Sequence, residues 1–260
     1  MHVSGAYAAR QTVEAGPLSL RSSLRTQAVI ELDLWYWSLD LANPVNTDAR
    51  FQDYLSSDEK ERANRFVKPH DKERFIRSRG RMREILAGYL NHEASTLQFD
   101  ITGNGKPVFA DGPAFNLSHS GGWAALVVAE VPNDLLLGID IEAYRPVEQG
   151  IATRVFSKAE QSDLGEMPKH MWELGFFRGW TRKEAVIKAT AQGFSADLSS
   201  FDVSLSQTAK VLRADPPLPS PERWHMLDLN LPQNFAGAVV GVTEGEKLAL
   251  RNVVGQIEVY

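Results

Sequence analysis

The alternation of hydrophobic and polar residues predicts where the ordered part of this chain begins. From Ile30 to Tyr36 every second residue is apolar, while Trp35 and Trp37 lie on the opposite face, a period of two that is typical of a β-strand. Residues 1–28 show no such periodicity, so we expect a flexible N-terminal tail there. No apolar run reaches the roughly 18 to 20 residues of a transmembrane helix, and we expect no membrane span.

Two further local patterns predict a helix start and a hairpin. The sequence Ser-Ser-Asp-Glu at 56–59 places serine and aspartate where they can cap the free N–H groups of a following helix. Segments 97–102 and 107–110 flank Asn104-Gly105, a dipeptide that favours a tight turn, so we expect a β-hairpin there.

Three short sequence similarities recur in the same order roughly one hundred residues further along the chain. The preserved order indicates two copies of a helix, strand, strand unit, which we place in residues 29–134 and 135–260. We therefore expect an α+β fold in which two similar α/β halves are related by a pseudo-twofold axis, with the active site in the cleft between them. The matching pairs are 75–77 with 176–178, 99–101 with 201–203, and 123–128 with 235–240.

The composition excludes several kinds of site and bears on the cellular compartment. The chain has 260 residues, 28 Lys and Arg, 33 Asp and Glu, and no Cys, which gives a formal net charge of −5. Without cysteine it can form no disulfide, iron–sulfur cluster, thiolate metal site or cysteine nucleophile. The absence of cysteine is compatible with a reducing compartment, and we expect a cytoplasmic protein.

Basic residues gather in one segment of this acidic chain. From Lys60 to Arg83 there are ten basic and three acidic residues. On a helical wheel Arg79 and Arg83 fall within the arc of apolar residues, whereas Arg77 and Arg81 fall on the opposite side. A buried guanidinium group requires an anion, because its desolvation costs several kcal/mol, so the two inward arginines predict either a structural carboxylate or a bound phosphate.

Acidic residues gather on a different segment. Residues 135–142 read as a strand, and its period of two places Asp140 and Glu142 on one face. Paired carboxylates suit a hard cation such as Mg²⁺, although an edge-strand salt bridge is the alternative. On the helix predicted after residue 176, Glu184 and Lys188 form an i, i+4 pair at the edge of the apolar face.

Four motifs together resemble a known family, the Sfp-type 4'-phosphopantetheinyl transferases. The resemblance covers roughly residues 50–205, and the stretch of Arg74 to Arg83 also resembles that family's arginine-rich helix. The Trp and Lys-Glu-Ala form of the last motif resembles the subgroup that serves polyketide, lipid and non-ribosomal peptide assembly lines. The motifs are Gly-Lys-Pro at 105–107, Phe-Asn-Leu-Ser-His-Ser at 115–120, Gly-Ile-Asp-Ile-Glu at 138–142, and Trp-Thr-Arg-Lys-Glu-Ala-Val-Ile-Lys at 180–188.

The resemblance implies an activity, a cofactor and partners. Such an enzyme transfers the 4'-phosphopantetheine arm of coenzyme A to a serine of an apo acyl or peptidyl carrier protein and releases adenosine 3',5'-bisphosphate. Coenzyme A is then the co-substrate and Mg²⁺ the cofactor. We expect a monomer with no nucleic-acid or membrane partner.

The resemblance also implies roles for individual residues. Asp140, Glu142 and Glu184 would hold Mg²⁺, and Glu184, Lys188 and Asp140 would be the catalytic residues. Glu184 is either only a metal ligand or also the base that takes the serine proton, directly or through a metal-bound water. The residues implied to bind coenzyme A are Arg79, Arg83, Lys106, Ser118, His119 and Lys188.

Two other functions compete with this interpretation. A different Mg²⁺-dependent phosphotransferase would keep the carboxylates, but the sequence contains no glycine-rich phosphate loop of the Walker kind. A nucleic-acid-binding arm would use the basic segment at 60–83, where the aromatic residues are few and the chain as a whole is acidic.

Overall fold

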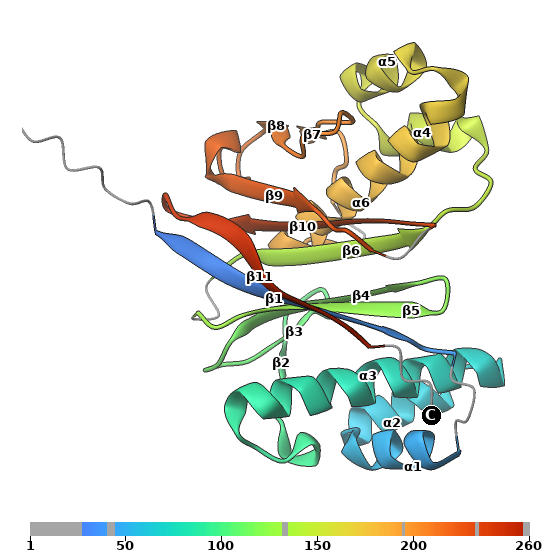
Figure 1. The fold of residues 1–260 in the computed structure, drawn as a ribbon, viewed down its shortest axis with the longest axis vertical. Helices are drawn as coiled ribbons and strands as arrows, with labels where there is room; N and C mark the ends of the chain where they lie inside the picture. Colours follow the sequence, from blue (N-terminus) through green and yellow to red (C-terminus); the bar gives the residue numbers. More distant parts are fainter. Residues whose placement is uncertain (1–27, 41–44, 132–134, 194–195, 232–233, 257–260) are drawn as a thin grey trace, which may run out of the picture.

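The computed structural model describes residues 28–40, 45–131, 135–193, 196–231 and 234–256, so the predicted tail lies almost wholly outside the described residues. Two β-sheets lie one above the other, and helices cover the outer side of each (Figure 1). This mixture of largely antiparallel sheets with separate helices is the predicted α+β class. Within the described ranges, no helix is both long and apolar enough to cross a membrane.

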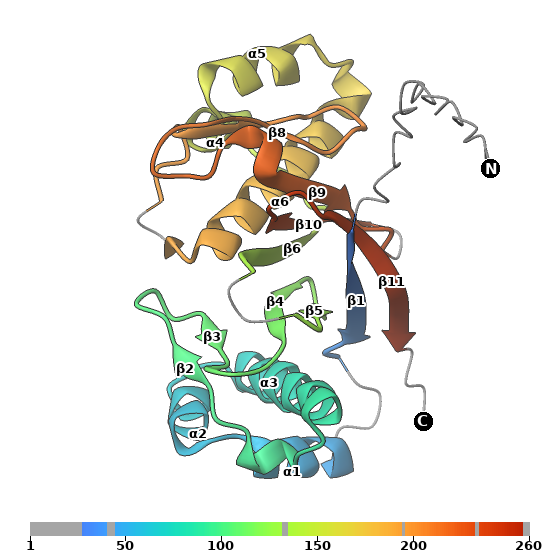
Figure 2. The same ribbon diagram turned by 90° about the vertical axis from the view of Figure 1, so that its left-hand side faces the viewer.

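The first sheet combines both ends of the described chain. Its strands lie in the order β11-β1-β5-β4, with β11 parallel to β1 and the other pairs antiparallel. Helix α3 covers its outer side, and α1 and α2 lie beyond α3 (Figure 2). The elements are β1 (Val29–Ser38), α1 (Val45–Tyr54), α2 (Ser57–Asn64), α3 (Pro69–Leu90), β4 (Ala114–Ser120), β5 (Trp123–Ala129) and β11 (Lys247–Gln256).

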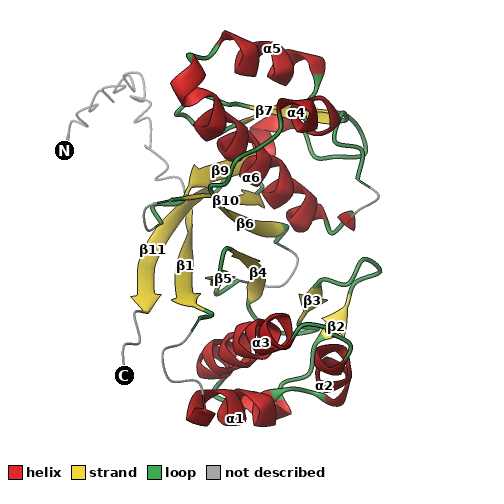
Figure 3. Cartoon of the chain, turned by 90° about the vertical axis from the view of Figure 1, so that its right-hand side faces the viewer, coloured by secondary structure: helices red, strands yellow, loops and turns green. Residues whose placement is uncertain are grey.

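The second sheet has the order β6-β10-β9, all antiparallel. Helix α6 covers it, with α4 and α5 beyond (Figure 3). These elements are β6 (Leu137–Ala143), α4 (Gln149–Val155), α5 (Lys158–Glu166), α6 (Trp172–Thr190), β9 (Trp224–Asp228) and β10 (Phe235–Val242). Two hairpins, β2 (Asp100–Ile101) with β3 (Pro107–Val108) and β7 (Phe201–Val203) with β8 (Val211–Ala214), and short 3₁₀ turns at Ala94–Thr96, Lys169–Met171 and Pro221–Arg223 complete the structure.

The two halves run through their elements in the same order. Each begins with a strand and continues with a long helix, a two-stranded hairpin and two more strands, and in each sheet the last of these strands lies between the other two. The sequence similarities fall on α3 and α6, at β2 and β7, and on β5 and β10. Strand β11 lies outside this pattern, because it carries the end of the chain back to the first sheet.

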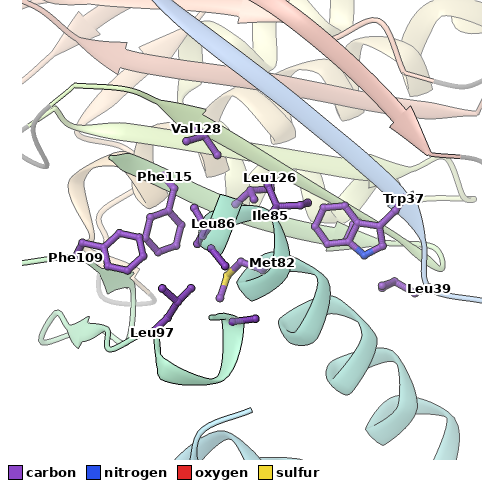
Figure 4. Close-up of a cluster of buried hydrophobic side chains, with 13 residues drawn as sticks. Trp37, Leu39, Met82, Ile85, Leu86, Leu97, Phe109, Phe115, Leu126 and Val128 are labelled. Carbon is purple, nitrogen blue, oxygen red and sulfur yellow. The ribbon is translucent and has the colours of Figure 1, made fainter. Parts of the chain in front are cut away.

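The alternation predicted for the first strand decides how the layers pack. Leu32 and Leu34 of β1 are fully buried in the core between the two sheets. Trp35 and Trp37 point the other way, into the core between the first sheet and α3, where Met82 lies (Figure 4). Each fully buried large apolar side chain contributes about 2 kcal/mol, so both faces of the sheet stabilise the fold.

The predicted helix start and hairpin are confirmed. Helix α2 begins after Ser56, whose Oγ accepts a hydrogen bond from the Glu59 backbone N–H, while the Glu59 carboxylate accepts one from the Ser56 N–H. This reciprocal pair satisfies two of the free donors at the helix start. The hairpin turns at Asn104-Gly105, where Gly105 has a φ of +85°, but its paired strands are only two residues long each.

The predicted orientation of Arg77 is wrong. The helical wheel places Arg77 on the outer side of α3, yet the residue is buried, and its Nη1 donates to the Leu39 carbonyl at 2.7 Å. Helix α3 is covered on two sides, by the sheet and by α1, and at Gly80 an added Cβ would lie 2.3 Å from Phe51 Cβ. A helix between two layers has no wide solvent side, so a single apolar arc does not describe it.

Candidate active site

Strand β6 places its two acidic residues under helix α6. Leu137, Ile139 and Ile141 lie in the core between the sheets, so Asp140 and Glu142 share the opposite face, as the sequence predicts. The helix lies directly on this face.

Gly138 makes that close approach possible. A Cβ added there would be 2.0 Å from the Ala185 carbonyl oxygen and 2.5 Å from the Ala189 nitrogen. The glycine therefore allows α6 to carry Glu184 and Lys188 close to the β6 carboxylates.

Lys188 binds Asp140 across these two elements. Its Nζ lies 2.7 Å from Asp140 Oδ1 and 2.8 Å from Ser118 Oγ, and Ser118 Oγ donates to the same Asp140 oxygen at 2.9 Å. Asp140 is buried, and its other oxygen, Oδ2, has no hydrogen-bond partner. Burial raises the pKa of Asp140, and the charge of Lys188 opposes this rise.

Glu142 is held by donors from three elements. Its Oε2 accepts from Ser120 Oγ at 2.7 Å and from Arg145 Nη1 at 2.9 Å, and its Oε1 accepts from Trp180 Nε1 at 3.2 Å. The sequence motifs contained Ser120 and Trp180 without indicating this role, and Arg145 was missed altogether. The chain gave no signal for Arg145 beyond its position three residues after Glu142.

Polar side chains of β4 join the first half to the second. Alternate residues of this strand point toward β6 and accept hydrogen bonds from its backbone. Ser118 and Ser120 therefore belong to a regular strand. The three bonds run from Ile139 N to Asn116 Oδ1 at 2.9 Å, from Ile141 N to Ser118 Oγ at 3.3 Å, and from Ala143 N to Ser120 Oγ at 3.2 Å.

Glu184 faces the same carboxylates. Burial and the negative charges of Asp140 and Glu142 raise its pKa, while the charge of Lys188 lowers it. Lys188 forms its ion pair with Asp140, not with Glu184 four residues earlier. In the described part of the chain, no three His, Asp or Glu side chains are grouped closely enough to form a ready-made metal site.

His119 lies at the end of β4, next to these groups. Its pKa is below the ordinary value because the surrounding protein desolvates the ring, and because Lys188, Arg79 and Arg62 carry positive charge; Glu142 opposes this effect. The side chain is exposed and has mainly cations around it, which suits contact with an anion.

Arg79 is a cation without a carboxylate partner among the described residues. Its Nη1 lies 3.7 Å from the Met82 sulfur, and its guanidinium lies 5.8 Å from the centre of the Phe75 ring. Burial lowers its pKa, and the more distant charge of Glu59 only partly offsets this. Such a group is stabilised by a bound anion.

Arg83 has the structural carboxylate that the sequence left open. Its Nε donates to Glu59 Oε2 at 2.7 Å, and its Nη1 donates to the carbonyls of Ala94 and Leu97 at 3.1 and 3.0 Å. The guanidinium also lies 4.9 Å from the centre of the Phe99 ring. These bonds tie α3 to α2 and to the turn that follows α3.

The hairpin of the first half reaches into the second half. Lys106 Nζ donates to the Leu137 carbonyl at 2.8 Å, and Asn104 Nδ2 donates to the Ala191 carbonyl at the end of α6 at 2.6 Å. Burial lowers the pKa of Lys106 to about 8. An ammonium group that donates to one carbonyl retains further donors for an anion.

Two buried cations, which the sequence analysis did not single out, fix α6 next to the site. The Arg182 guanidinium bonds to both oxygens of Asp228 on β9, at 2.9 and 2.6 Å. Lys183 Nζ bonds to both oxygens of Glu160 on α5 and to the Phe201 carbonyl, all within 2.9 Å. Glu184 follows directly, so its backbone position is set from two sides.

The basic segment at 60–83 is neutralised in part within the protein. Five of its ten basic residues pair with carboxylates, and the partners come from α2, α3 and the residues after β1. The pairs are Arg65 with Glu61, Arg74 with Asp40, Arg77 with Glu73, Arg81 with Glu84, and Arg83 with Glu59.

Comparison with known proteins gives matches in both halves. Residues 136–241 match the family described as 4'-phosphopantetheinyl transferase superfamily, and residues 43–131 match 4'-phosphopantetheinyl transferase, N-terminal. The chain is 36% identical over 219 residues to the 4'-phosphopantetheinyl transferase HetI of Nostoc sp., covering 80% of this chain and 86% of HetI. It is 37% identical over 176 residues to psf-1 of Bacillus pumilus, covering 65% and 72%, and 34% identical over 164 residues to Sfp of Bacillus subtilis, covering 62% and 71%.

Proposed function

The chain belongs to the 4'-phosphopantetheinyl transferase superfamily, and on this basis we propose that it transfers the phosphopantetheine arm of coenzyme A to a serine of apo carrier proteins and releases adenosine 3',5'-bisphosphate. The family makes it a transferase of the EC 2.7.8.7 type. The observation that carries the proposal is the meeting of Lys188 and Glu184 on α6 with Asp140 and Glu142 on β6.

The proposed architecture is that of two halves, residues 29–134 and 135–260, related by a pseudo-twofold axis. Their common order of elements and common strand order support this relation. The active site then lies where β4 of one half meets β6 of the other, and residues of both halves contribute to it.

The reaction forms a bond between the serine oxygen and the β-phosphorus of coenzyme A. It breaks the bond from that phosphorus to the bridging oxygen, which leaves with adenosine 3',5'-bisphosphate. A pyrophosphate diester is anionic, so catalysis requires positive charge at the phosphates and a serine hydroxyl held in line. Lys188 supplies such charge, and we assign it to a phosphate oxygen of the leaving group.

Three carboxylates are proposed to hold Mg²⁺. Asp140, Glu142 and Glu184 offer the hard oxygen ligands that this ion prefers, and the buried Asp140 Oδ2 is an oxygen without a partner. Burial and its acidic neighbours raise the pKa of Glu184 while Lys188 lowers it, and an added cation would relieve the repulsion between the carboxylates. Bound here, the cation would offset charge on the pyrophosphate.

Coenzyme A is proposed to bind across the two halves. Arg79, His119 and Lys106 contact its phosphates, because each has a polar group that its protein neighbours leave available. Arg83 and Ser118 support coenzyme A binding indirectly, through contacts within the protein. Arg83 fixes α3, and Ser118 holds Lys188 and Asp140 in place.

Glu184 is proposed to take the serine proton, directly or through a water molecule. Its raised pKa makes it a better base than an ordinary carboxylate at the same pH. The Trp180 and Lys-Glu-Ala form of its motif points to carriers of polyketide, lipid or non-ribosomal peptide assembly lines. We further propose that the enzyme acts as a cytoplasmic monomer.

Mass spectrometry tests the activity. The protein is incubated with coenzyme A, Mg²⁺ and a panel of apo acyl and peptidyl carrier proteins, and the expected result is the gain of one phosphopantetheine arm. The Lys188→Met variant should lose this activity, whereas Arg154→Gln, an exposed change on α4, should keep it. No modification of any carrier class would overturn the proposal.

A further inference from the structure

We propose that Arg145 is a displaceable counter-ion of Glu142, which weakens the binding of a divalent cation at the site until its guanidinium group moves away. The inference rests on the proposed function, because it takes Glu142 as a metal ligand.

Most of the lone pairs of the Glu142 carboxylate already accept hydrogen bonds. Ser120 Oγ and Arg145 Nη1 both donate to its Oε2, and Trp180 Nε1 donates to its Oε1. An ionised carboxylate offers about four lone-pair sites, so three of them are taken. A cation that binds Glu142 through Oε2 must therefore displace one of two donors.

Two of the three donors are fixed by their own packing. Ser120 lies in β4 and also accepts a hydrogen bond from Ala143 N. Trp180 lies in α6 and stacks on Phe176 with an interplanar angle of 12°. Each of these donors is therefore held in place by a second contact of its own.

Arg145 is the donor that can move. It lies two residues after the end of β6, and its side chain is 58% exposed, whereas that of Glu142 is 18% exposed. Its other hydrogen bond, to the backbone carbonyl of Ala143, is long at 3.5 Å. The guanidinium lies 5.6 Å from the Phe177 ring centre, so it retains a stacking surface when the ion pair opens.

The arrangement has an electrostatic consequence for metal binding. A guanidinium group and a divalent cation compete for the same carboxylate oxygen and repel each other, so removal of the Arg145 charge should tighten cation binding. Breaking an ion pair as exposed as this one should change the cation affinity by roughly 2- to 5-fold. The partial burial of Glu142 favours the upper end of that range.

The test measures Mn²⁺ binding, not turnover. Binding is followed by the loss of the free Mn²⁺ signal in electron paramagnetic resonance, with wild type, Arg145→Gln and the matched control Arg154→Gln. We expect Arg145→Gln to lower the Kd about 3- to 5-fold, Arg154→Gln to leave it unchanged, and Arg145→Lys to restore the wild-type value. An unchanged or raised Kd in Arg145→Gln, or an equal fall in Arg154→Gln, would overturn the inference.

A fourth variant separates this inference from the proposed function. Asp140→Asn should raise the Kd for Mn²⁺ if the β6 carboxylates are the ligands. When Asp140→Asn weakens binding but Arg145→Gln does not change it, the proposed metal site stands and only the role of Arg145 is wrong. When Asp140→Asn binds Mn²⁺ as well as the wild type, the proposed metal site itself is wrong.

Discussion

Lys188 Nζ and Asp140 Oδ1 lie 2.7 Å apart, and both contact Ser118 Oγ. This contact brings together three elements, α6 and β6 of the second half and β4 of the first. The lysine offsets the charge of a buried carboxylate, which would otherwise be strongly unfavourable. A phosphate or a cation that enters the site therefore meets a pair of opposite charges already held in place.

The substitution Ser118→Ala tests whether this serine positions the pair or contacts coenzyme A. If it positions Lys188 and Asp140, kcat should fall and KM for coenzyme A should change by less than about 2-fold. Loss of its hydrogen bonds should also lower the free energy of unfolding by about 1 to 2 kcal/mol. Steady-state kinetics with a carrier protein and urea unfolding give both numbers. A raised KM with unchanged kcat would assign Ser118 to coenzyme A instead.

A pH dependence is expected from Lys106. Its pKa of about 8 means that the free enzyme loses this charge above pH 8, so the affinity for coenzyme A should fall as the pH rises through that value. Isothermal titration between pH 6.5 and about 9.5 measures this, and Lys106→Met should bind more weakly at low pH and without the same decline. A parallel decline in Lys106→Met would assign the effect to another group.

The same lysine affects stability in a defined window. Between about pH 8 and the ordinary lysine value near 10.5, the unfolded chain binds a proton that the folded protein does not. The Lys106 contribution to the free energy of unfolding should therefore increase as the pH rises through this window. The Lys106→Met variant should lack this increase.

Gly138→Ala should separate α6 from β6. The added methyl group would overlap the Ala185 carbonyl and the Ala189 nitrogen, and these backbone atoms of α6 cannot move away without moving the helix. We expect a loss of about 2 kcal/mol or more in the free energy of unfolding and a fall in kcat, since Glu184 and Lys188 move with the helix. Gly150→Ala, where an added Cβ meets nothing within 4 Å, is the matched control. Equal effects of both substitutions would contradict the role of close packing.

The sequence predicted the parts of the fold that depend on short-range pattern. The alternation around Leu32 and Trp35, the cap at Ser56 and the turn at Asn104 each act over a few residues, and the structure contains all three. The shared face of Asp140 and Glu142 follows from the same rule. Such features depend on backbone geometry within one element.

Contacts between distant segments could not be predicted in the same way. Arg77 is buried on a side of α3 that a single-helix wheel assigns to solvent: its guanidinium reaches the Leu39 carbonyl after β1, and α1 also packs on α3. Likewise, the i, i+4 spacing of Glu184 and Lys188 suggested an ion pair between them. Lys188 instead forms its ion pair with Asp140, across the contact between β6 and α6. Tertiary partners decide between the bonds that local spacing allows.

The last prediction separates the two possible roles of Glu184 by comparing Glu184→Gln with Asp140→Asn. Each change is nearly isosteric and removes one negative charge. If both residues only bind Mg²⁺, both variants should require more Mg²⁺ for half-maximal rate, and saturating Mg²⁺ should restore much of the activity. If Glu184 also takes the serine proton, Glu184→Gln should stay slow at saturating Mg²⁺ by roughly 100-fold or more.

The structure favours the second outcome. Glu184 lies on α6 and has a raised pKa, whereas Asp140 is buried on β6 and held by Lys188 and Ser118, so the two carboxylates differ in their freedom to meet an incoming hydroxyl. The pH profile of kcat adds an independent measurement: a rising limb that belongs to Glu184 should be present in the wild type and absent in Glu184→Gln, and loss of the Asp140 charge should move this limb to lower pH in Asp140→Asn. Full recovery of Glu184→Gln by added Mg²⁺ would remove the base role and leave proton transfer to water.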